Sequence, residues 1–390
     1  MTSEVLVIGG GPAGSLTALL LARAGMRVRL FERAQCPRDK LCGDTVNPGA
    51  WALLGALGVA DPIARVAKPI GGMVVTGLGR ARVEGVYGPG IVGMALRRRV
   101  LDELLLQTAA AAGVAVETGV RVDAPLMDDD RVTGVRAAAA GVERRVTAPL
   151  VVAADGRHSR LAFGLGLSRF AARPQRWAYG ATYADVTGLG DRGEMHVRED
   201  GYVGIAPLPD GTANVCVVRE WHRAAAPLRG DVLAQAIAAD GLLRERFVRA
   251  TRLGAATILG PLAVDSRAAG VPGLLLAGDA AGFVDPMTGD GMRFAIRGAE
   301  LAAEAALREL ATGQPAWAWL TAARQHEFSA KWRLNRALRG LVAWPAGVRA
   351  ASALAAAWSA PLVPLIPLAG DVPLARRLAV AAGRRAEARG

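Results

Sequence analysis

Short, uninterrupted apolar runs recur along the chain, and each is followed closely by a glycine or an acidic residue. Three such runs lie at residues 5–8, 150–153 and 274–277, and a fourth, at residues 28–31, is interrupted only by Arg29. Runs of this length without polar alternation are typical of strands buried on both faces of a parallel sheet. Apolar positions that repeat every three or four residues predict amphipathic helices at residues 15–25, 48–57, 93–113 and 292–310. The pattern therefore predicts an α/β fold.

A second pattern, the alternation of apolar and polar residues, predicts antiparallel strands. Within residues 168–257 it favours strands at 177–186, 201–207 and 212–219. Further strands are expected at 72–86, 114–117, 120–124, 131–137 and 143–147. Because residues 168–257 separate two of the buried runs, we expect an antiparallel sheet inserted into the domain that holds the parallel one.

Glycines follow the first apolar run at the spacing of a dinucleotide-binding turn. Gly9, Gly11 and Gly14 form GxGxxG in the segment EVLVIGGGPAG. The first glycine makes a tight turn, the second lets a pyrophosphate approach the backbone, and the third lets helix and strand pack. The second run ends at Glu32, 18 residues beyond Gly14, where a carboxylate can bind the adenosine ribose hydroxyls. A carboxylate repels a ribose 2′-phosphate, so FAD or NAD is expected here and NADP is not.

The last buried run leads into a glycine-rich stretch, LLLAGDAAGFVDPMTGDGMRFA. Asp279 follows the strand, and Pro286, Gly289 and Gly291 precede the helix. Glycines let backbone N–H groups approach a ligand, and a helix N-terminus adds partial positive charge. This suits a group that becomes anionic, such as a reduced flavin. The same residues could also form the strand, loop and capping aspartate of any α/β protein.

A third strand end carries Asp155, in the segment LVVAADGRHSR. In a parallel sheet this carboxylate would share a rim with Gly9 and Asp279, near the crevice where such sheets bind ligands. Among the basic residues, one of Arg97, Arg98 and Arg99 could reach the pyrophosphate bidentately. Those not used would form a solvated basic helix face.

These motifs together resemble a known superfamily. GxGxxG with Glu32, RxxLD at residues 98–102, ADG at 154–156 and AGDAAGFVDPMTGDG occur in the same order in both. The chain resembles the FAD-dependent oxidoreductases that include hydroxylases of the p-hydroxybenzoate type, geranylgeranyl reductases and flavin-dependent halogenases. The resemblance covers residues 5–310, and the KLCGD loop at residues 40–44 is similar to the geranylgeranyl reductase branch.

The resemblance implies FAD as the cofactor and NAD(P)H as a transient reductant. By this resemblance Ala13, Glu32 and Arg98 hold the ADP half of FAD, and Val122 lies beside the adenine. The full set of expected cofactor residues is Gly9, Gly11, Pro12, Ala13, Gly14, Glu32, Arg33, Cys42, Gly43, Arg98, Val122, Asp155, Asp279, Pro286, Gly289, Gly291 and Met292.

The same resemblance assigns the flavin end of the site. Asp155 would support both the pyrophosphate and the passing nicotinamide, and Asp279 would bind the ribityl chain. Gly289, Gly291 and Met292 would border the flavin ring.

The resemblance also implies a domain plan. The expected fold is a Rossmann-like FAD-binding domain of the glutathione reductase type, built from residues 1–70, 94–167 and 258–312. A substrate-binding antiparallel sheet would comprise residues 71–93 and 168–257 and would roof the flavin. Residues 313–390 would form a carboxyl-terminal helical region.

One segment of the expected sheet departs from the pattern of the superfamily. Residues 201–207 read GYVGIAP, where halogenases have WxWxIP and archaeal geranylgeranyl reductases have YxWxFP. Tyr202 is retained, whereas Gly204 and Ala206 replace bulky residues. We therefore expect a wider substrate pocket lined by these three residues. The departure argues against halogenation and leaves isoprenoid reduction open.

Composition narrows the possibilities further. The chain has 390 residues, 52% hydrophobic and 21% charged, enough for one large globular unit or two intimate domains. Cys36, Cys42 and Cys216 form no CxxC pair and the four histidines show no ligand spacing, so no metal site is expected. The first strand begins by Val5 without a basic flank, which favours a cytoplasmic protein with no secretory signal.

Basic residues gather near the carboxyl terminus. Residues 324–390 hold 11 Lys or Arg and 3 Asp or Glu, so 11 minus 3 gives +8 of the formal net charge of +12. The uncharged run at 350–370 is long enough to span a bilayer, but Pro361, Pro364 and Pro367 would break a spanning helix. The region is expected to lie on an anionic membrane surface, to close the active site as a hydrophobic lid, or to form an ordinary helical cap. No module that reads nucleic acid accompanies the charge.

Three functions fit these observations. The small residues Gly204 and Ala206 favour a NAD(P)H-dependent monooxygenase that hydroxylates a hydrophobic aromatic or polyketide-like substrate through a flavin C4a-hydroperoxide. The KLCGD loop and the apolar carboxyl-terminal region suggest, as the alternative, reduction of C=C bonds in an isoprenoid or lipid. A flavin-holding adaptor without turnover is the third, because no side chain stands out as a catalytic acid or base.

Overall fold

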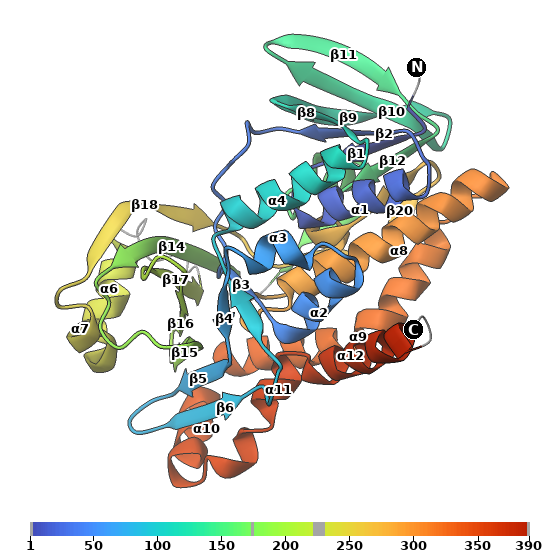
Figure 1. Cartoon of the computed structure of the whole chain (residues 1–390). Coiled ribbons are helices and arrows are strands. Elements are labelled where there is room, and N and C mark those ends of the chain that lie inside the picture. Colours follow the sequence, from blue (N-terminus) through green and yellow to red (C-terminus); the bar gives the residue numbers. More distant parts are fainter. Residues whose placement is uncertain (1–2, 173–174, 221–230, 388–390) are drawn as a thin grey trace.

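A six-stranded sheet forms the centre of the nucleotide-binding half of the molecule, in a computed structural model that describes residues 3–172, 175–220 and 231–387 (Figure 1). The strand order is β20-β21-β12-β1-β2-β8, and every neighbouring pair except β20 and β21 is parallel. The strands are β1 (Val5–Ile8), β2 (Val28–Glu32), β8 (Ala115–Thr118), β12 (Leu150–Ala153), β20 (Gly270–Val271) and β21 (Leu274–Leu276). The four apolar runs of the sequence are thus neighbouring strands.

Strand alternation divides the side chains of this sheet between two layers. Val5 and Val7 of β1 pack against helices, whereas Leu6 and Ile8 pack against a second sheet, and all four are 0–3% exposed. Burial of each such side chain stabilises the fold by roughly 1.5–3 kcal/mol. The helices are α1 (Pro12–Arg23), α4 (Arg98–Ala111) and α8 (Gly291–Thr312), and the second sheet comprises β9 (Val120–Asp128), β10 (Arg131–Ala139) and β11 (Val142–Thr147).

A seven-stranded sheet forms the second half, with the order β18-β14-β17-β16-β15-β5-β6. Its neighbours are antiparallel apart from β5 and β15. The alternating segments of the sequence correspond to β5, β6, β14, β16 and β17, whereas β15 and β18 were not predicted. The elements are β5 (Gly72–Thr76), β6 (Arg82–Val86), β14 (Arg176–Ala184), β15 (Arg192–Arg198), β16 (Gly201–Pro207), β17 (Ala213–Glu220) and β18 (Thr251–Leu259), with α6 (Val232–Ala239) and α7 (Gly241–Arg246) on one face.

Shorter elements join the two halves. Helix α2 begins where its sequence predicts, because Pro48 occupies the first turn and Asn47 Oδ1 accepts a hydrogen bond from Ala50 N at 2.9 Å. The short elements are β3 (Thr45–Val46), α2 (Pro48–Ala56), α3 (Ala60–Ala64), β4 (Lys68–Ile70), β7 (Gly93–Ala95), α5 (Arg160–Gly164), β13 (Ser168–Phe170), β19 (Val264–Ser266) and the 3₁₀ helix η1 (Gly278–Ala281).

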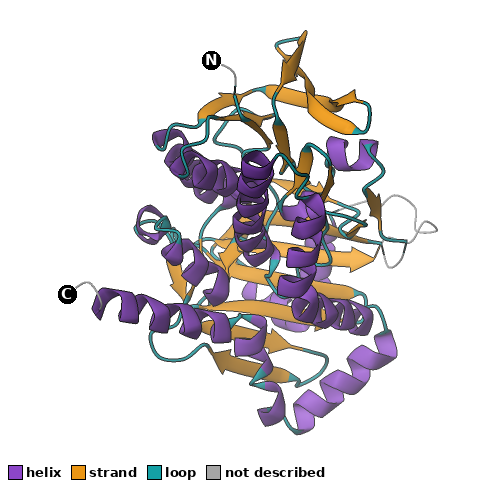
Figure 2. Cartoon of the chain, turned by 90° about the vertical axis from the view of Figure 1, so that its right-hand side faces the viewer, coloured by secondary structure: helices purple, strands orange, loops and turns teal. Residues whose placement is uncertain are grey.

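The carboxyl-terminal region is helical, as the sequence predicts, and lies at the end of the molecule opposite β10 and β11 (Figures 1 and 2). Helix α12 packs along α2, and α10 and α11 pack against the β5–β6 hairpin. The elements are α9 (Trp317–Val342), α10 (Pro345–Ala357), η2 (Ala360–Leu362), α11 (Leu365–Ala369) and α12 (Val372–Glu387). Within the described ranges, no single helix has the length and apolarity to cross a bilayer, although α9 and α10 meet the test as a pair bent by 101°.

Candidate active site

The glycine-rich turn after β1 brings three strand ends together. Gly9 has a φ of +104°, and a Cβ there would collide with the carbonyl oxygen of Ala154. A Cβ on Gly14 would collide in the same way with the carbonyl oxygen of Gly9. The rim predicted for the parallel sheet is therefore so tightly packed at these two positions that only glycine fits.

Glu32, at the end of β2, lies beside this turn and is 6% exposed. Its carboxylate accepts hydrogen bonds from Gly10 N at 2.7 Å and Ala34 N at 2.9 Å. Arg38 Nε lies 3.3 Å from Glu32 Oε1. Glu32 therefore fixes the turn as well as offering a carboxylate to a ribose, a second role that the motif alone does not indicate.

The ADG segment after β12 holds a carboxylate with an unused acceptor. Asp155 Oδ2 accepts a hydrogen bond from Arg160 N at 3.1 Å, while Oδ1 is buried and has no partner among the described residues. Burial raises the pKa of Asp155 to about 6. A buried polar atom without a partner is costly, so this oxygen is suited to a ligand that donates a hydrogen bond.

Asp279, in η1, lies in the field of three basic side chains from separate segments. Burial lowers the pKa of Lys40, Arg157 and Arg324, to about 10 for Arg324, and the charge of Asp279 opposes the shift in each case. The Asp279 carboxylate itself accepts no hydrogen bond within the part of the chain that the structure describes. It is therefore available to a ligand.

Two of these arginines also carry unused donors. Arg157 and Arg324 are 9% and 3% exposed, and Nη1 of each is buried without a partner in the described residues. Arg324 Nη2 donates to Ala281 O at 3.2 Å, and the Arg157 guanidinium lies 5.5 Å from the centroid of Phe283. Cationic donors poised in this way suit an anionic group. Sequence reasoning singled out neither residue, because no local motif marks them.

Arg98 is held beside the KLCGD loop. It is 8% exposed and forms a bidentate pair with Asp102, with Nε 2.9 Å from Oδ1 and Nη2 3.1 Å from Oδ2. Its backbone N–H donates to Asp44 Oδ1 at 3.0 Å. Arg97 and Arg99 instead form ion pairs with Asp210 and Asp39. Only Arg98 of the three is therefore locked into the interior.

The residues present fit FAD. Helix α1 has no side-chain cap at Gly11, so its first N–H groups suit a pyrophosphate. A Cβ on Gly289 would meet nothing within 4 Å, which leaves room for a planar ring beside the N-terminus of α8. The unpartnered atoms of Asp155, Arg157 and Arg324 supply polar contacts for such a ligand.

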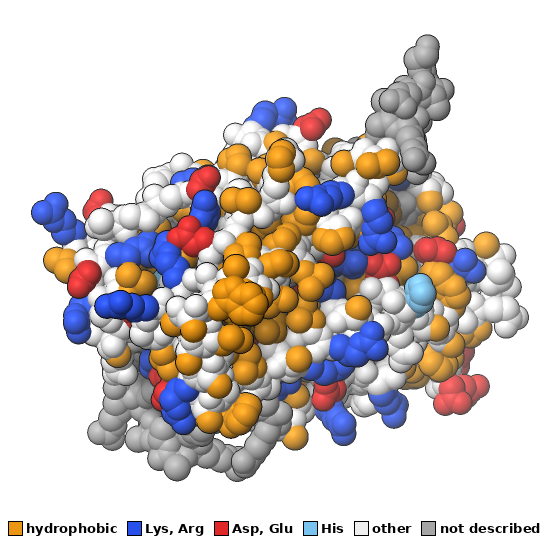
Figure 3. Space-filling view, turned by 90° about the horizontal axis from the view of Figure 1, so that it is seen from below, with side chains coloured by type: hydrophobic (Ala, Val, Ile, Leu, Met, Phe, Trp, Pro, Cys, Tyr) orange, Lys and Arg blue, Asp and Glu red, His pale blue; other side chains and the backbone are white. Residues whose placement is uncertain are grey.

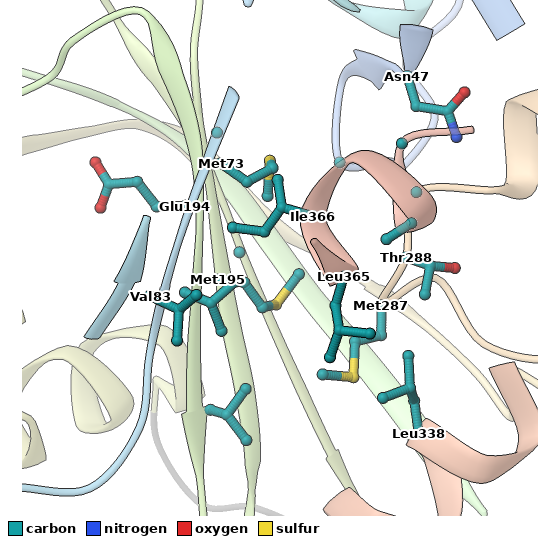
Figure 4. A pocket seen from close by; sticks show the side chains of 18 of the residues that line it. Asn47, Met73, Val83, Glu194, Met195, Met287, Thr288, Leu338, Leu365 and Ile366 are labelled. Atoms are coloured by element: carbon teal, nitrogen blue, oxygen red, sulfur yellow. The ribbon is translucent and has the colours of Figure 1, made fainter. Parts of the chain in front are cut away.

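A largely apolar cavity of about 370 Å³ begins at the expected flavin end (Figure 4). Gly43, Asn47 and Pro286–Gly289 line one end, and the inner faces of α10 and α11 line the other. Between them, Figure 4 shows Met73, Met195 and Ile366 converging from the seven-stranded sheet and α11. The Glu194 side chain points away from the cavity and pairs with Arg246 on the opposite face of the seven-stranded sheet.

Polar residues tie the flavin-end loop to the carboxyl-terminal helices. Asp290 is fully buried, and its carboxylate lies 3.3 Å from Lys331 Nζ and accepts hydrogen bonds from Asn47 Nδ2 at 3.2 Å and Thr288 Oγ1 at 2.8 Å. Burial raises the pKa of Asp290. Lys331 Nζ also donates to Leu368 O at 2.9 Å. None of these contacts was predicted from the sequence.

The expected substrate residues divide into two groups. Gly204 and Ala206 line the cavity, and a Cβ on Gly204 would lie 3.8 Å or more from its neighbours. Tyr202 projects from the same face of β16 but does not line the cavity, contrary to expectation. Its hydroxyl donates to Asp285 Oδ1 at 2.7 Å, and Arg176 Nη1 donates to Asp285 Oδ2 at 3.2 Å.

The remaining expected cofactor residues have varied environments. Val122 and Met292 are 7% and 5% exposed and have their side chains in the core, so any contact with a cofactor would involve their backbone. Arg33 is exposed. Cys42 is partly buried, and its carbonyl accepts a hydrogen bond from Asn214 Nδ2 at 2.6 Å. Pro12 and Ala13 begin α1, Gly291 begins α8, and Pro286 and Gly43 line the cavity.

Comparison with known proteins decides the family. A family profile described as an FAD binding domain matches residues 2–334. The chain belongs to this family of FAD-dependent oxidoreductases. The flavoprotein assignment expected from the motifs is thereby confirmed, as is FAD as the cofactor.

Relatives within this family carry several names. A digeranylgeranylglycerophospholipid reductase of Methanosarcina acetivorans is 30% identical over 331 residues, covering 80% of this chain and 76% of the relative. A geranylgeranyl diphosphate reductase of Rhodobacter capsulatus is 31% identical, covering 81% and 78%. A menaquinone reductase of Mycolicibacterium smegmatis is 31% identical, covering 77% and 76%. The flavoprotein is therefore related to the geranylgeranyl reductase branch.

Solved structures support the fold. The myxobacterial chondrochloren halogenase aligns with a TM-score of 0.79 at 25% identity, covering 85% of this chain and 81% of the halogenase. A geranylgeranyl bacteriochlorophyll reductase-like protein from Thermoplasma acidophilum aligns with a TM-score of 0.79 at 22% identity, covering 91% of both chains. The fold predicted from the sequence, an α/β FAD-binding domain with an inserted antiparallel sheet and carboxyl-terminal helices, is confirmed.

Proposed function

We propose that this flavoprotein reduces C=C bonds in the isoprenoid chain of a lipid. The observation that carries the proposal is the apolar cavity, which leads from the Pro286–Gly289 loop to α10 and α11. An isoprenoid tail is long and offers no hydrogen-bonding groups. A site for it needs apolar walls and a reducing group at one end.

The cavity lining has this character. Met73, Met195, Met287, Leu338 and Ile366 contribute methyl, thioether and branched side chains to the wall shown in Figure 4. Flexible methionine side chains adapt to irregular apolar surfaces, which suits a chain with methyl branches. The small residues Gly204 and Ala206 leave the wall between them unobstructed. An apolar wall also excludes water from the reacting carbons.

The names of the relatives support the same substrate class. The relatives described above are reductases named for geranylgeranyl diphosphate, a digeranylgeranylglycerophospholipid and menaquinone. The first two names specify different polar groups on geranylgeranyl chains. We infer that the cavity of this chain recognises the isoprenoid part and that the polar head differs among relatives. Of the two enzyme functions expected from the sequence, these names favour reduction over hydroxylation.

The chain would hold its cofactor from both ends. When bound, FAD supplies hydride chemistry and accepts electrons from NAD(P)H. Glu32, Arg98 and the N-terminus of α1 would hold its ADP half. Asp279 would orient the ribityl chain, and the N-terminus of α8 would stabilise negative charge on the ring.

Reduction of a double bond also requires a proton at the second carbon. Two protonated groups are part of the cavity lining, the Tyr87 phenol and the Cys216 thiol. Burial raises the pKa of Tyr87, and burial raises the pKa of Cys216 to about 12. Both groups therefore hold their protons throughout the neutral pH range and are candidates to supply one.

Hydroxylation of a hydrophobic aromatic compound is the second candidate function. The observation in its favour is the open wall at Gly204 and Ala206, which leaves room for a flat ring beside β16. Oxygen distinguishes the two reactions, because hydroxylation consumes it and reduction does not.

The experiment is product analysis with reduced enzyme under nitrogen and under air. Geranylgeranyl lipids and prenylated quinones would be supplied in detergent with NADH, NADPH or dithionite. The proposal predicts products that have gained two hydrogen atoms per reduced bond under both atmospheres. Products that gain one oxygen atom, and only under air, would establish the monooxygenase instead.

A further inference from the structure

Beyond Arg349, which pairs with Glu199 near the start of α10, the outer surface of α10, η2 and α11 is apolar and carries no charged side chain. Residues 350–370 contain no Lys, Arg, Asp or Glu. The segment is nevertheless well exposed, with exposed fractions of 54% for Leu354, 64% for Trp358, 50% for Leu365 and 47% for Leu368. Its other exposed residues are Ala350, Ala353, Ala356, Ala357, Ala360, Pro361 and Pro364. We call this surface the apolar face.

The cavity reaches the apolar face. Leu365 and Leu368 line the cavity and are also about half exposed, so they stand where the interior wall meets the outside. Ala355 and Leu362, which are partly exposed, line the same end. An apolar tail placed against this face would therefore lie next to the cavity lining without crossing a charged surface.

Basic side chains lie on the helices that adjoin the apolar face. Arg333 and Arg336 on α9 and Arg376 and Arg377 on α12 are exposed, and none forms an ion pair with another residue in the described ranges. Viewed from below, hydrophobic side chains gather in the middle of the surface, with Lys and Arg side chains among those around them (Figure 3). Trp344, 62% exposed, precedes α10.

We propose that the apolar face binds an anionic membrane surface and that the lipid substrate passes from the bilayer into the cavity between α10 and α11. The second half of this proposal rests on the proposed function, whereas the first does not. Tryptophan beside aliphatic residues, with arginines at the margin, matches the interface of a bilayer that carries negative lipid. A second copy of the chain would bring the same positive charge to the contact, which opposes dimerisation through this face.

The test is co-sedimentation of the full-length FAD-loaded protein with vesicles of phosphatidylcholine alone or mixed with phosphatidylglycerol. The first variant is Leu354→Ser/Trp358→Ser, two residues that are exposed and do not line the cavity. The matched control is Val248→Ser/Ile258→Ser, whose side chains are 78% and 56% exposed away from the carboxyl-terminal helices. Thermal unfolding and FAD content establish that both variants are folded.

We expect wild type and control to bind the mixed vesicles and the first variant to bind at least about tenfold more weakly, since two large apolar side chains no longer enter the bilayer. Binding should also weaken as salt rises, because the Debye length falls from ~10 Å at 0.1 M to ~3 Å at 1 M. Wild-type protein that stays in solution with mixed vesicles at low salt overturns the proposal. So does equal binding by both variants, or a dimer that the first variant alone makes monomeric.

Turnover in detergent separates this proposal from the proposed function. The first variant should reduce a detergent-dispersed isoprenoid lipid at the wild-type rate while losing activity on the same lipid in vesicles. Vesicle binding without any reduction in detergent would support the apolar face and contradict the reductase.

Discussion

Lys331 of α9 lies with its Nζ 3.3 Å from Oδ1 of Asp290, a fully buried carboxylate that immediately precedes α8. The same Nζ donates to the carbonyl oxygens of Leu368 and Ala369 in α11. One ammonium group thus connects the loop at the flavin end to the helix at the mouth of the cavity. A shift of this loop relative to α11 would disturb at least one of these contacts.

The first prediction concerns this pair. Lys331→Met keeps most of the length of the side chain but leaves a buried carboxylate without its cation, so the free energy of unfolding should fall by about 3 kcal/mol. Urea unfolding followed by tryptophan fluorescence measures the change. Asp290→Asn combined with Lys331→Met should recover part of the loss, because the uncompensated charge is gone.

Arg308→Met is the matched control, because it removes an exposed pair with Glu304 on α8. It should leave the unfolding midpoint nearly unchanged. Equal losses of unfolding free energy in Arg308→Met and Lys331→Met would mean that the buried pair contributes no more stability than an exposed one.

The second prediction separates cofactor binding from folding. Asp279 accepts no hydrogen bond from the described residues, so Asp279→Ala should lower the thermal stability of the apoprotein only through the lost attraction to Lys40, Arg157 and Arg324. It should weaken FAD binding by about tenfold to a hundredfold, the equivalent of one charge-assisted hydrogen bond of roughly 1.5–3 kcal/mol.

Glu32→Ala is the comparison for Asp279→Ala. It removes the acceptor for Gly10 N and Ala34 N, so both FAD affinity and apoprotein stability should fall. Fluorescence titration with FAD measures affinity, and calorimetry of the apoprotein measures stability. Unchanged FAD affinity in Asp279→Ala would show that this carboxylate does not contact the cofactor.

The third prediction is a pH dependence at Asp44. Burial raises the pKa of this carboxyl to about 7 from an ordinary value of 3.8. Between these two pH values the folded chain holds a proton that the unfolded chain has lost, so the Asp44 contribution to stability declines as pH rises through that window. Asp44→Asn removes the decline and keeps an oxygen to accept from Arg98 N.

The backbone also tolerates this change, because Asp44 has a φ of +52°, a conformation that asparagine adopts readily. Relative to wild type, the melting temperature of Asp44→Asn should be similar near pH 4, rise up to about pH 7, and then level off. Asp39→Asn, in the neighbouring exposed part of the loop, is the control. A difference in melting temperature between Asp44→Asn and wild type that does not grow with pH would contradict the raised pKa of Asp44.

The fourth prediction tests the cavity wall. Gly204→Trp places an indole where a Cβ has ordinary clearance from Met195 and Cys216, so the protein should fold and bind FAD normally. Reduction of the isoprenoid substrate should fall by at least about tenfold, because the side chain occupies the cavity. Flavin reduction by NAD(P)H without substrate should stay close to the wild-type rate.

Gly190→Trp is the control, because Gly190 is exposed with nothing within 4 Å of an added Cβ. Gly190→Trp should match wild type in FAD binding, in reduction of the isoprenoid substrate and in flavin reduction by NAD(P)H. Wild-type turnover in Gly204→Trp would mean that substrate does not pass β16.

Much of the fold could be read from local patterns, because each pattern reports a local cause. Gly9 and Gly14 are fixed by collisions within one turn, and the four apolar runs are buried on both faces of one sheet. Asp155 could be placed at the rim because parallel strands end together. These inferences needed no knowledge of distant residues.

The rest depends on contacts between segments far apart in the chain. Asp290 meets Asn47 and Lys331, which are separated from it by 243 and 41 residues, and no local spacing predicts such a cluster. Tyr202 was expected in the substrate pocket from its place in the GYVGIAP segment. Its partner Asp285 lies on another segment, so its absence from the cavity lining could not be foreseen.

In the proposed reduction, electrons pass from this flavoprotein to a C=C bond without oxygen. The most direct measurement is a single-turnover experiment in an oxygen-free stopped-flow cell, in which reduced enzyme is mixed with a geranylgeranyl lipid and flavin absorbance is followed. The proposed reduction predicts that the absorbance of oxidised flavin returns and that the lipid recovered has gained two hydrogen atoms. Flavin that stays reduced until oxygen is admitted, with lipid that then carries a new hydroxyl group, would contradict it.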